Sequence, residues 1–247
     1  MNSFRLGLCS VTFRKKSVEQ VVEIAKKAGI DAIEWGADVH VKTIEDARKA
    51  KALCDDSKIA ISSYGSYVNS ADYDENKWDE TCRIAKELGA SSVRIWLGRK
   101  NSEETNEAEY QLLLENTAKM CSIARDYGLD VCPECHDHTF NNNTDAFLKI
   151  CEDIDEDNFK TYFQSRYFRM EYDLDRIDRT YPYIRDVHVS YRDLKREQYF
   201  RKKNPDYLDI LLKKFRAMDF NGTVLIEFVR YDSEKQLVSD AEKIRSY

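Results

Sequence analysis

The stretch CPECHDH, at residues 132–138, brings thiols, a carboxylate and imidazoles close together. It is compatible with a thiol redox pair, a zinc site, or a site built on Glu134 and His136. If the stretch ends a β-strand, alternation sends Cys132 and Cys135 to opposite faces, whereas Glu134 and His136 share a face. The sequence also offers no second ligand pair at zinc-ribbon spacing. The pattern therefore favours chemistry by Glu134 and His136 over chemistry by sulfur.

Two further polar residues are embedded in apolar segments. Glu227 lies within TVLIEFV and His188 within DVHVSY. A single Glu or His near a strand end is often only a hydrogen-bonded surface residue. Inside an apolar strand, however, such a group must be paired or coordinated to offset its lost hydration. We therefore predict functional roles for Glu227 and His188.

A repeated helix–glycine–strand junction indicates which elements position these residues. Each copy has the cationic end of an amphipathic helix, then a glycine suited to a left-handed helix end, then a short β-rich run. The copies are AKKAGIDAIEW (25–35), AKELGASSVRIW (85–96), ARDYGLDVCPE (124–134) and, more loosely, FRAMDFNGTVLIE (215–227). Helices and strands must therefore alternate along the chain.

The periodicity of apolar residues predicts eight strand–helix units. The predicted strands are 5–9, 30–35, 58–64, 91–97, 129–134, 159–164, 185–190 and 222–228. The predicted helices are one that begins after Ser17, with Gln20 at capping-box spacing, and 43–54, 75–88, 104–127, 144–153, 173–181, 206–217 and 234–246. This count and length match an α/β fold of the (β/α)8 TIM barrel type. A doubly wound open sheet is the alternative, but the first predicted strand lacks the glycine-rich turn typical of a nucleotide site.

Composition places further limits on the protein. The chain has 247 residues, of which 42% are hydrophobic, and has no linker-like segment, so we expect one domain over 1–247. A net charge of -6 disfavours nucleic acid as a partner. The N-terminus does not resemble a signal peptide, no segment is apolar enough to span a membrane, and seven scattered cysteines are typical of reduced thiols. We expect a cytoplasmic protein with a small-molecule partner.

In a parallel barrel, the groups that do chemistry project from the carboxyl ends of the strands. All four histidines lie in or near such ends. The polar and aromatic residues at these ends are Glu34, His40, Tyr64, Ser66, Arg94, Trp96, Glu134, His136, His138, Gln164, His188 and Glu227. Their concentration predicts an active site at the mouth of the barrel.

Six motifs in order resemble the xylose isomerase-like TIM barrel family of sugar and sugar-phosphate isomerases and epimerases. They are IEWGADVH, SSYGSYV, VRIW, CPECH, DVHVSYRD and VLIE, and in this order the resemblance extends over nearly the whole chain. The resemblance implies a divalent metal ion held by Glu134, His188 and Glu227, with Gln164 at the position where the family usually has Asp. Gln164 supplies an amide oxygen in place of a carboxylate, which weakens binding of a hard cation. We expect manganese, magnesium or zinc.

The resemblance also implies proton transfer next to a sugar carbonyl through an enediolate. Glu134 and Glu227 are then the catalytic acid and base on either side of the substrate. The predicted substrate-binding residues are Glu34, His40, Tyr64, Arg94, Trp96, His136 and Arg192, with Trp35 as a further aromatic wall. Arg192, in the basic stretch YRDLKREQYFRKK, is a candidate for a substrate phosphate or carboxylate.

Two other functions use the same barrel. An apurinic-site endonuclease needs three zinc ions, and hence more ligands than four histidines and Gln164 offer. The second is a non-catalytic sugar-binding barrel that has lost its metal ion, in which Gln164 would mark a former metal-ligand position. A dehydratase acting on a cyclic keto-polyol shares the proton-abstraction step, and a homo-oligomer is compatible with each of these functions.

Overall fold

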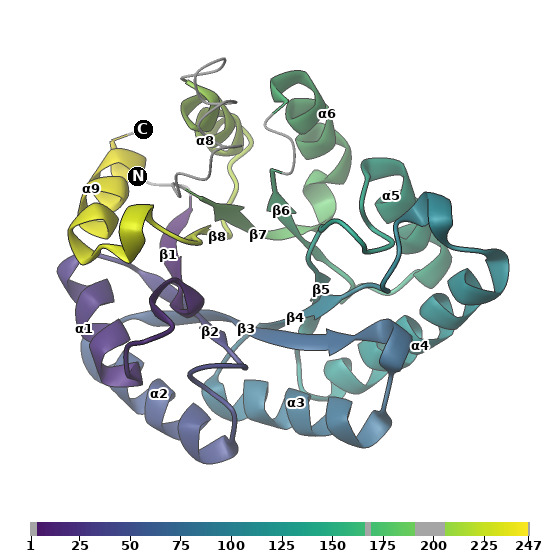
Figure 1. Cartoon of the computed structure of the whole chain (residues 1–247), viewed down its shortest axis with the longest axis horizontal. Coiled ribbons are helices and arrows are strands. Elements are labelled where there is room, and N and C mark those ends of the chain that lie inside the picture. The colour runs from purple at the N-terminus through teal and green to yellow at the C-terminus, as the bar shows by residue number, and fades with distance from the viewer. Residues whose placement is uncertain (1–3, 166–168, 191–205, 247) are drawn as a thin grey trace.

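Eight parallel strands form the centre of the molecule, and helices surround them (Figure 1). The computed structural model describes residues 4–165, 169–190 and 206–246. The strands are β1 (Arg5–Cys9), β2 (Ala32–Gly36), β3 (Ala60–Asn69), β4 (Ser92–Trp96), β5 (Asp130–Pro133), β6 (Thr161–Gln164), β7 (Ile184–Val189) and β8 (Thr223–Ile226). The helices are α1 (Val18–Lys27), α2 (Ile44–Ser57), α3 (Glu75–Leu88), α4 (Glu107–Asp126), α5 (Thr144–Ile154), α6 (Met170–Thr180), α8 (Tyr207–Ala217) and α9 (Glu234–Arg245).

The strands are hydrogen-bonded in the order β5-β4-β3-β2-β1-β8-β7-β6. β5 and β6 meet through a single parallel bridge between Val131 and Phe159, where the Val131 N–H donates to the carbonyl of Asn158 at 2.8 Å. The sheet is therefore a nearly closed barrel, which confirms the predicted (β/α)8 fold.

Helix boundaries follow local chemistry. The capping box predicted at the first helix is present, because Ser17 accepts from the Gln20 N–H and the Gln20 side chain accepts from the Ser17 N–H. Just after the C-terminal ends of α1, α3 and α4, three glycines have the left-handed conformation expected of them: φ is 67° at Gly29, 82° at Gly89 and 71° at Gly128. These caps fix where each helix ends and the next strand begins.

Several element boundaries differ from the prediction, most clearly at β3 and α6. β3 continues to Asn69, five residues beyond the predicted end, and α6 begins at Met170 rather than at 173. β3 also contains a register shift against β2, since Ile33 pairs with Ile61 but Glu34 pairs with Ser63. This bulge places Ser63, rather than Ser62, opposite Glu34.

Strand alternation divides the core into two layers. The larger layer fills the space between strands and helices and includes Leu8, Trp35 and Tyr64. A smaller cluster comprises Cys9, Val11, Cys132, Tyr162 and Leu225, contributed by or next to strands on different sides of the barrel. Residues on the same strand faces as this inner cluster point toward the barrel axis and form the site.

Among the described residues, no helix is both long and apolar enough to cross a membrane. All seven cysteines are buried, and none takes part in a disulfide.

Candidate active site

Inward-facing polar side chains gather at the carboxyl ends of the strands. Each lies in or directly after a different strand, because the inward positions of parallel strands meet at one end of the barrel. They are Glu34 of β2, Ser63 of β3, Arg94 of β4, Glu134 after β5, Gln164 of β6, His188 of β7 and Glu227 after β8.

Glu134, His188 and Glu227 converge, although they are far apart in sequence. One ligand atom from each lies within 4.8 Å of the others. His188 Nδ1 is 3.5 Å from Glu227 Oε2 and 3.1 Å from Gln164 Oε1. The structure thus brings together all four residues that the sequence proposed as ligands.

Arg94 is a buried cation between two of the carboxylates. Its Nη1 is 3.0 Å from Glu134 Oε2 and 3.5 Å from Glu34 Oε1. The guanidinium also lies 5.4 Å from the ring centroid of Tyr67. Arg94 was predicted to bind substrate, and the structure places it in ion pairs that hold Glu134 and Glu34.

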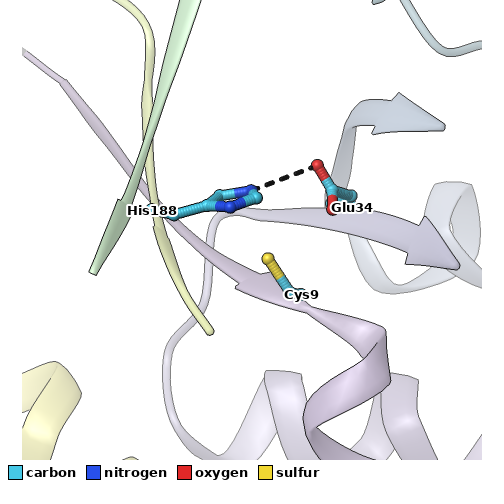
Figure 2. A group of neighbouring side chains, drawn as sticks. All are labelled: Cys9, Glu34 and His188. Atoms are coloured by element: carbon cyan, nitrogen blue, oxygen red, sulfur yellow. Dashed lines mark hydrogen bonds and ion pairs between the residues drawn. The ribbon is translucent and has the colours of Figure 1, made fainter. Parts of the chain in front are cut away.

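The other side of the His188 ring faces Glu34. His188 Nε2 is 3.4 Å from Glu34 Oε2, and the hydroxyl of Ser63 donates to that same oxygen at 2.8 Å. Figure 2 shows this contact and the sulfur of Cys9, which points toward the pair from below. Cys9, Glu34 and His188 also offer ligand atoms within 4.8 Å of one another.

The charges of the site alter its protonation. Burial lowers the pKa of His188, but the charges of Glu227 and Glu34 outweigh it and raise that pKa to about 9. Burial alone would raise the pKa of Glu34, but His188 and Arg94 hold it well below its usual range. Burial raises the pKa of Glu227, and the neighbouring charge of Glu134 adds to the effect. Glu34 is therefore a firmly ionised group, whereas Glu227 more readily accepts a proton.

The donor set is suited to a divalent cation. Two carboxylates, an imidazole and an amide oxygen are ligands that manganese, magnesium and zinc accept. Glu134 and His188 are almost fully buried, with 3% and 4% of their surfaces exposed. Three carboxylates crowded in this way need compensating positive charge: Arg94 supplies one charge, and a divalent cation would replace the proton on His188 and supply the rest. The residues of the site thus fit the metal that the sequence resemblance implies.

A cavity of about 340 Å³ lies on the side of Tyr67, the ring that Arg94 approaches. Trp96, two residues beyond Arg94 on the same face of β4, lines it together with Tyr67 and His138. The His136 ring packs edge-on against Trp96 with 4.9 Å between ring centroids. Trp96 and His136, both predicted to bind substrate, are therefore in contact with each other, and Trp96 forms part of the cavity wall.

Other predicted substrate residues lie elsewhere. Tyr64 and Trp35 pack in the layer between strands and helices, because they alternate with the inward-facing residues; the Tyr64 hydroxyl donates to the carbonyl of Val41 at 2.9 Å. Both ring nitrogens of His40 are engaged, by the Ser10 hydroxyl and the Lys16 carbonyl. The structure does not bring these three side chains to the site. Arg192 lies outside the described residues.

Two members of the site had not been singled out from the sequence. Ser63 was missed because the bulge in β3 changes which residue faces Glu34. Cys9 was counted only among the seven reduced thiols, although it occupies the carboxyl end of β1 and the same strand-end rule could have found it. Burial and the charge of Glu34 raise its pKa well above the usual value, so Cys9 remains a neutral thiol beside His188.

The fold and the site together define the class of this protein. It is a parallel (β/α)8 barrel whose site, made of carboxylates, an imidazole and a guanidinium, lies at the carboxyl ends of the strands. The chain belongs to a particular group of such proteins, the xylose isomerase-like TIM barrel family, whose model matches residues 22–247. The resemblance inferred from the six sequence motifs is thereby confirmed.

Solved structures with the same fold include enzymes of several kinds. The chain is similar to the probable 3-DHS dehydratase AsbF of Bacillus anthracis, with a TM-score of 0.81 and 16% identity over 98% of this chain and 99% of that one. It is also similar to D-psicose 3-epimerase of Clostridium cellulolyticum H10, with a TM-score of 0.74 and 14% identity over 98% and 97% of the two chains. A third similar structure is 3-keto-D-glucoside 4-epimerase, YcjR, of E. coli, with a TM-score of 0.75 and 14% identity over 99% and 100%. At these identities the likeness establishes the fold.

Among curated proteins, the chain is 20% identical over 186 residues to Proline dehydrogenase 2 of Bacillus subtilis strain 168. That match spans 74% of this chain and 60% of the relative. The chain therefore covers about three-fifths of the length of the curated protein it matches.

Proposed function

We propose that this protein is a divalent-metal-dependent sugar or sugar-phosphate isomerase or epimerase that moves a proton next to a carbonyl through an enediolate. The observation that carries the proposal is the convergence of Glu134, His188 and Glu227 within 4.8 Å at the mouth of a xylose isomerase-like barrel. Epimerases and a dehydratase among the similar structures support chemistry on polyhydroxylated carbonyl compounds.

Glu134, His188, Glu227 and the amide oxygen of Gln164 would hold the cation. When bound, a divalent cation supplies Lewis acidity that stabilises negative charge developing on the carbonyl oxygen. Metal binding to a histidine nitrogen requires that nitrogen to be unprotonated, so His188 would release its Nδ1 proton.

Glu227 and Glu134 are suited to proton transfer from two sides of a substrate, since they follow β8 and β5. With 12% of its side chain exposed, against 5% for Glu134, Glu227 is the carboxylate that a substrate C–H group reaches more readily. The ion pair with Arg94 at 3.0 Å holds Glu134 in place as its counterpart. In an epimerase, one group would remove the proton from one face and the other would return it to the opposite face.

The cavity lined by Tyr67 and Trp96 would receive the rest of the substrate. An aromatic ring packs well against the C–H face of a sugar, and Trp96 offers such a surface. Asn69 and Thr139 line the same cavity and offer polar groups for hydroxyls. A single sugar ring fits a volume of about 340 Å³.

Metal analysis of the purified protein, followed by exchange of carbon-bound hydrogen in deuterated water, tests the proposal. The substrate panel contains ketoses, their phosphates and cyclic keto-polyols. We expect one divalent ion per chain and deuterium at a carbon next to the carbonyl, with an epimer or an aldose–ketose partner as product. Deuterium uptake with a dehydrated product would instead assign a dehydratase. Three zinc ions with cleavage of abasic DNA, or sugar binding without metal or exchange, would overturn the proposal.

A further inference from the structure

We propose that Glu34 is a positioning residue that holds the His188 ring with Nδ1 toward the cation, and not a substrate-binding residue as its strand-end position first indicates. The inference rests on the proposed function, because it concerns the same metal site. It assigns to Glu34 a role in metal affinity that is separable from substrate binding.

The two nitrogens of His188 face different partners. Nδ1 lies toward Glu227 and Gln164, at 3.5 Å and 3.1 Å, whereas Nε2 lies 3.4 Å from Glu34 Oε2. A neutral imidazole that binds metal through one nitrogen keeps its proton on the other and donates it to a neighbouring acceptor. Glu34 is the acceptor on the Nε2 side, so its carboxylate selects the orientation and tautomer that leave Nδ1 free for the cation.

Glu34 is itself fixed from two sides. The Ser63 hydroxyl donates at 2.8 Å to Oε2, the oxygen that faces His188, while Arg94 lies 3.5 Å from Oε1. Gly65 leaves the space that this arrangement needs, because a Cβ there would lie 3.1 Å from Glu34 Oε1. Only 2% of Glu34 is exposed. A carboxylate held in this way is poorly placed to turn toward a substrate.

Two buried side chains also shield the contact between Glu34 and His188 from solvent. Cys9 is fully buried and directs its sulfur toward the Glu34–His188 pair (Figure 2). The Tyr162 ring lies 4.6 Å from the His188 ring, measured between centroids, and is likewise fully buried. Because hydrogen bonds are stronger where water is excluded, a charge-assisted contact here can fix the ring orientation.

Two substitutions of Glu34 separate hydrogen bonding from charge. Glu34→Asp keeps the charge but shortens the side chain by one methylene, so the carboxylate no longer reaches Nε2. Glu34→Gln keeps the reach and an acceptor oxygen but loses the charge. We expect Mn²⁺ affinity, measured by calorimetric titration, to fall about tenfold to a hundredfold in Glu34→Asp and less in Glu34→Gln. If Glu34 contributed charge alone, the order would be reversed.

Two neighbouring serines provide a matched pair in case Glu34 variants fold poorly. Ser63→Ala removes the donor to Glu34 Oε2, and we expect a several-fold loss of Mn²⁺ affinity. Ser62→Ala is the control, because the Ser62 hydroxyl is 3.3 Å from that of Ser63 and is not the donor to Glu34. Ser62→Ala should bind Mn²⁺ as the wild type does.

A spectroscopic readout reports the ring directly. In the Zn²⁺-loaded protein, nitrogen-15 NMR of His188 should show a protonated Nε2 in the wild type and in Ser62→Ala, and loss of that slowly exchanging proton in Glu34→Asp. Wild-type Mn²⁺ affinity in Glu34→Asp with a raised KM alone would assign Glu34 to substrate binding and overturn this inference. Absence of Mn²⁺ binding by the wild type would instead overturn the proposed function, and this inference with it.

Discussion

Among the individual residues, Glu227 is partly exposed, and the backbone directly after it has an uncommon conformation. Its side chain is 12% exposed, whereas His188 beside it is 1% exposed, so Glu227 is the member of this pair that faces the mouth. Phe228, the next residue, has φ of 64°, an uncommon conformation for a bulky side chain, and its N–H is held by the Thr12 hydroxyl at 2.9 Å. Such strain at a functional position is maintained only when surrounding contacts enforce it. The contacts at the end of β8 therefore hold Glu227 in one position.

Replacing Glu227 by Gln should abolish proton transfer while the fold is retained. Because the amide cannot accept the proton, we expect kcat to fall by about a hundredfold to ten-thousandfold. Deuterium exchange into the substrate measures the loss, and far-ultraviolet circular dichroism checks the fold. Glu234→Gln is the matched control: this exposed carboxylate pairs with Lys16 and should have little effect. Unchanged turnover in Glu227→Gln would refute its catalytic assignment.

Among the elements, β8 illustrates how tightly the strands meet at the bottom of the barrel. The Gly222 carbonyl, just before β8, accepts from the Arg5 N–H of β1 at 3.0 Å. A Cβ on Gly222 would lie 2.2 Å from the backbone carbonyl oxygen of Arg185 in β7 and 2.4 Å from the Phe220 ring. Glycine is therefore required where β1, β7 and β8 approach one another.

Gly222→Ala should destabilise the protein, because the clash with a backbone oxygen cannot be relieved by rotating a side chain. Overpacking of this kind costs about 1–3 kcal/mol or more, and urea unfolding should show a correspondingly lower midpoint. Gly128→Asn is the control, because the space around Gly128 is open and Asn tolerates its φ of 71°. Equal stability of Gly222→Ala and the wild type would show that the strands can separate at this point.

At the scale of the whole molecule, the proposed site spans the seam between β5 and β6, the neighbouring strands that share the fewest paired positions. β5 and β6 share one bridge, whereas β2 and β3 pair over five positions. Glu134 follows β5, while Gln164, His188 and Glu227 belong to the segments on the other side of that seam. A cation held by these residues would join the two edges.

Bound Mn²⁺ should therefore stabilise the folded protein. At a concentration one hundred times its Kd, a ligand of the native state adds about 2.7 kcal/mol, which corresponds to a rise in Tm of roughly 5–10 °C for a chain of this size. Thermal unfolding followed by circular dichroism measures the rise, and a chelator should reverse it. His188→Ala, which lacks the imidazole ligand, should show little change on adding Mn²⁺. An equal rise in His188→Ala would place the stabilising ion elsewhere.

The order of helices and strands, and the barrel that they form, could be predicted from the residues alone. Helix caps and strand periods are local properties, and they also indicated Glu134, His188 and Glu227, because polar groups in apolar strands stand out in the sequence. Their roles as ligands and catalysts remain predictions.

Which side chains meet across the barrel became known only from the three-dimensional arrangement of the strands. Tyr64 and Trp35 face the helices, Ser63 faces Glu34 because of a bulge, and Arg94 pairs with carboxylates from β2 and from the loop after β5. The physical reason is that alternation fixes a face only once strand boundaries and register are known. Register depends on hydrogen bonding between strands about thirty residues apart or more, which no local pattern specifies.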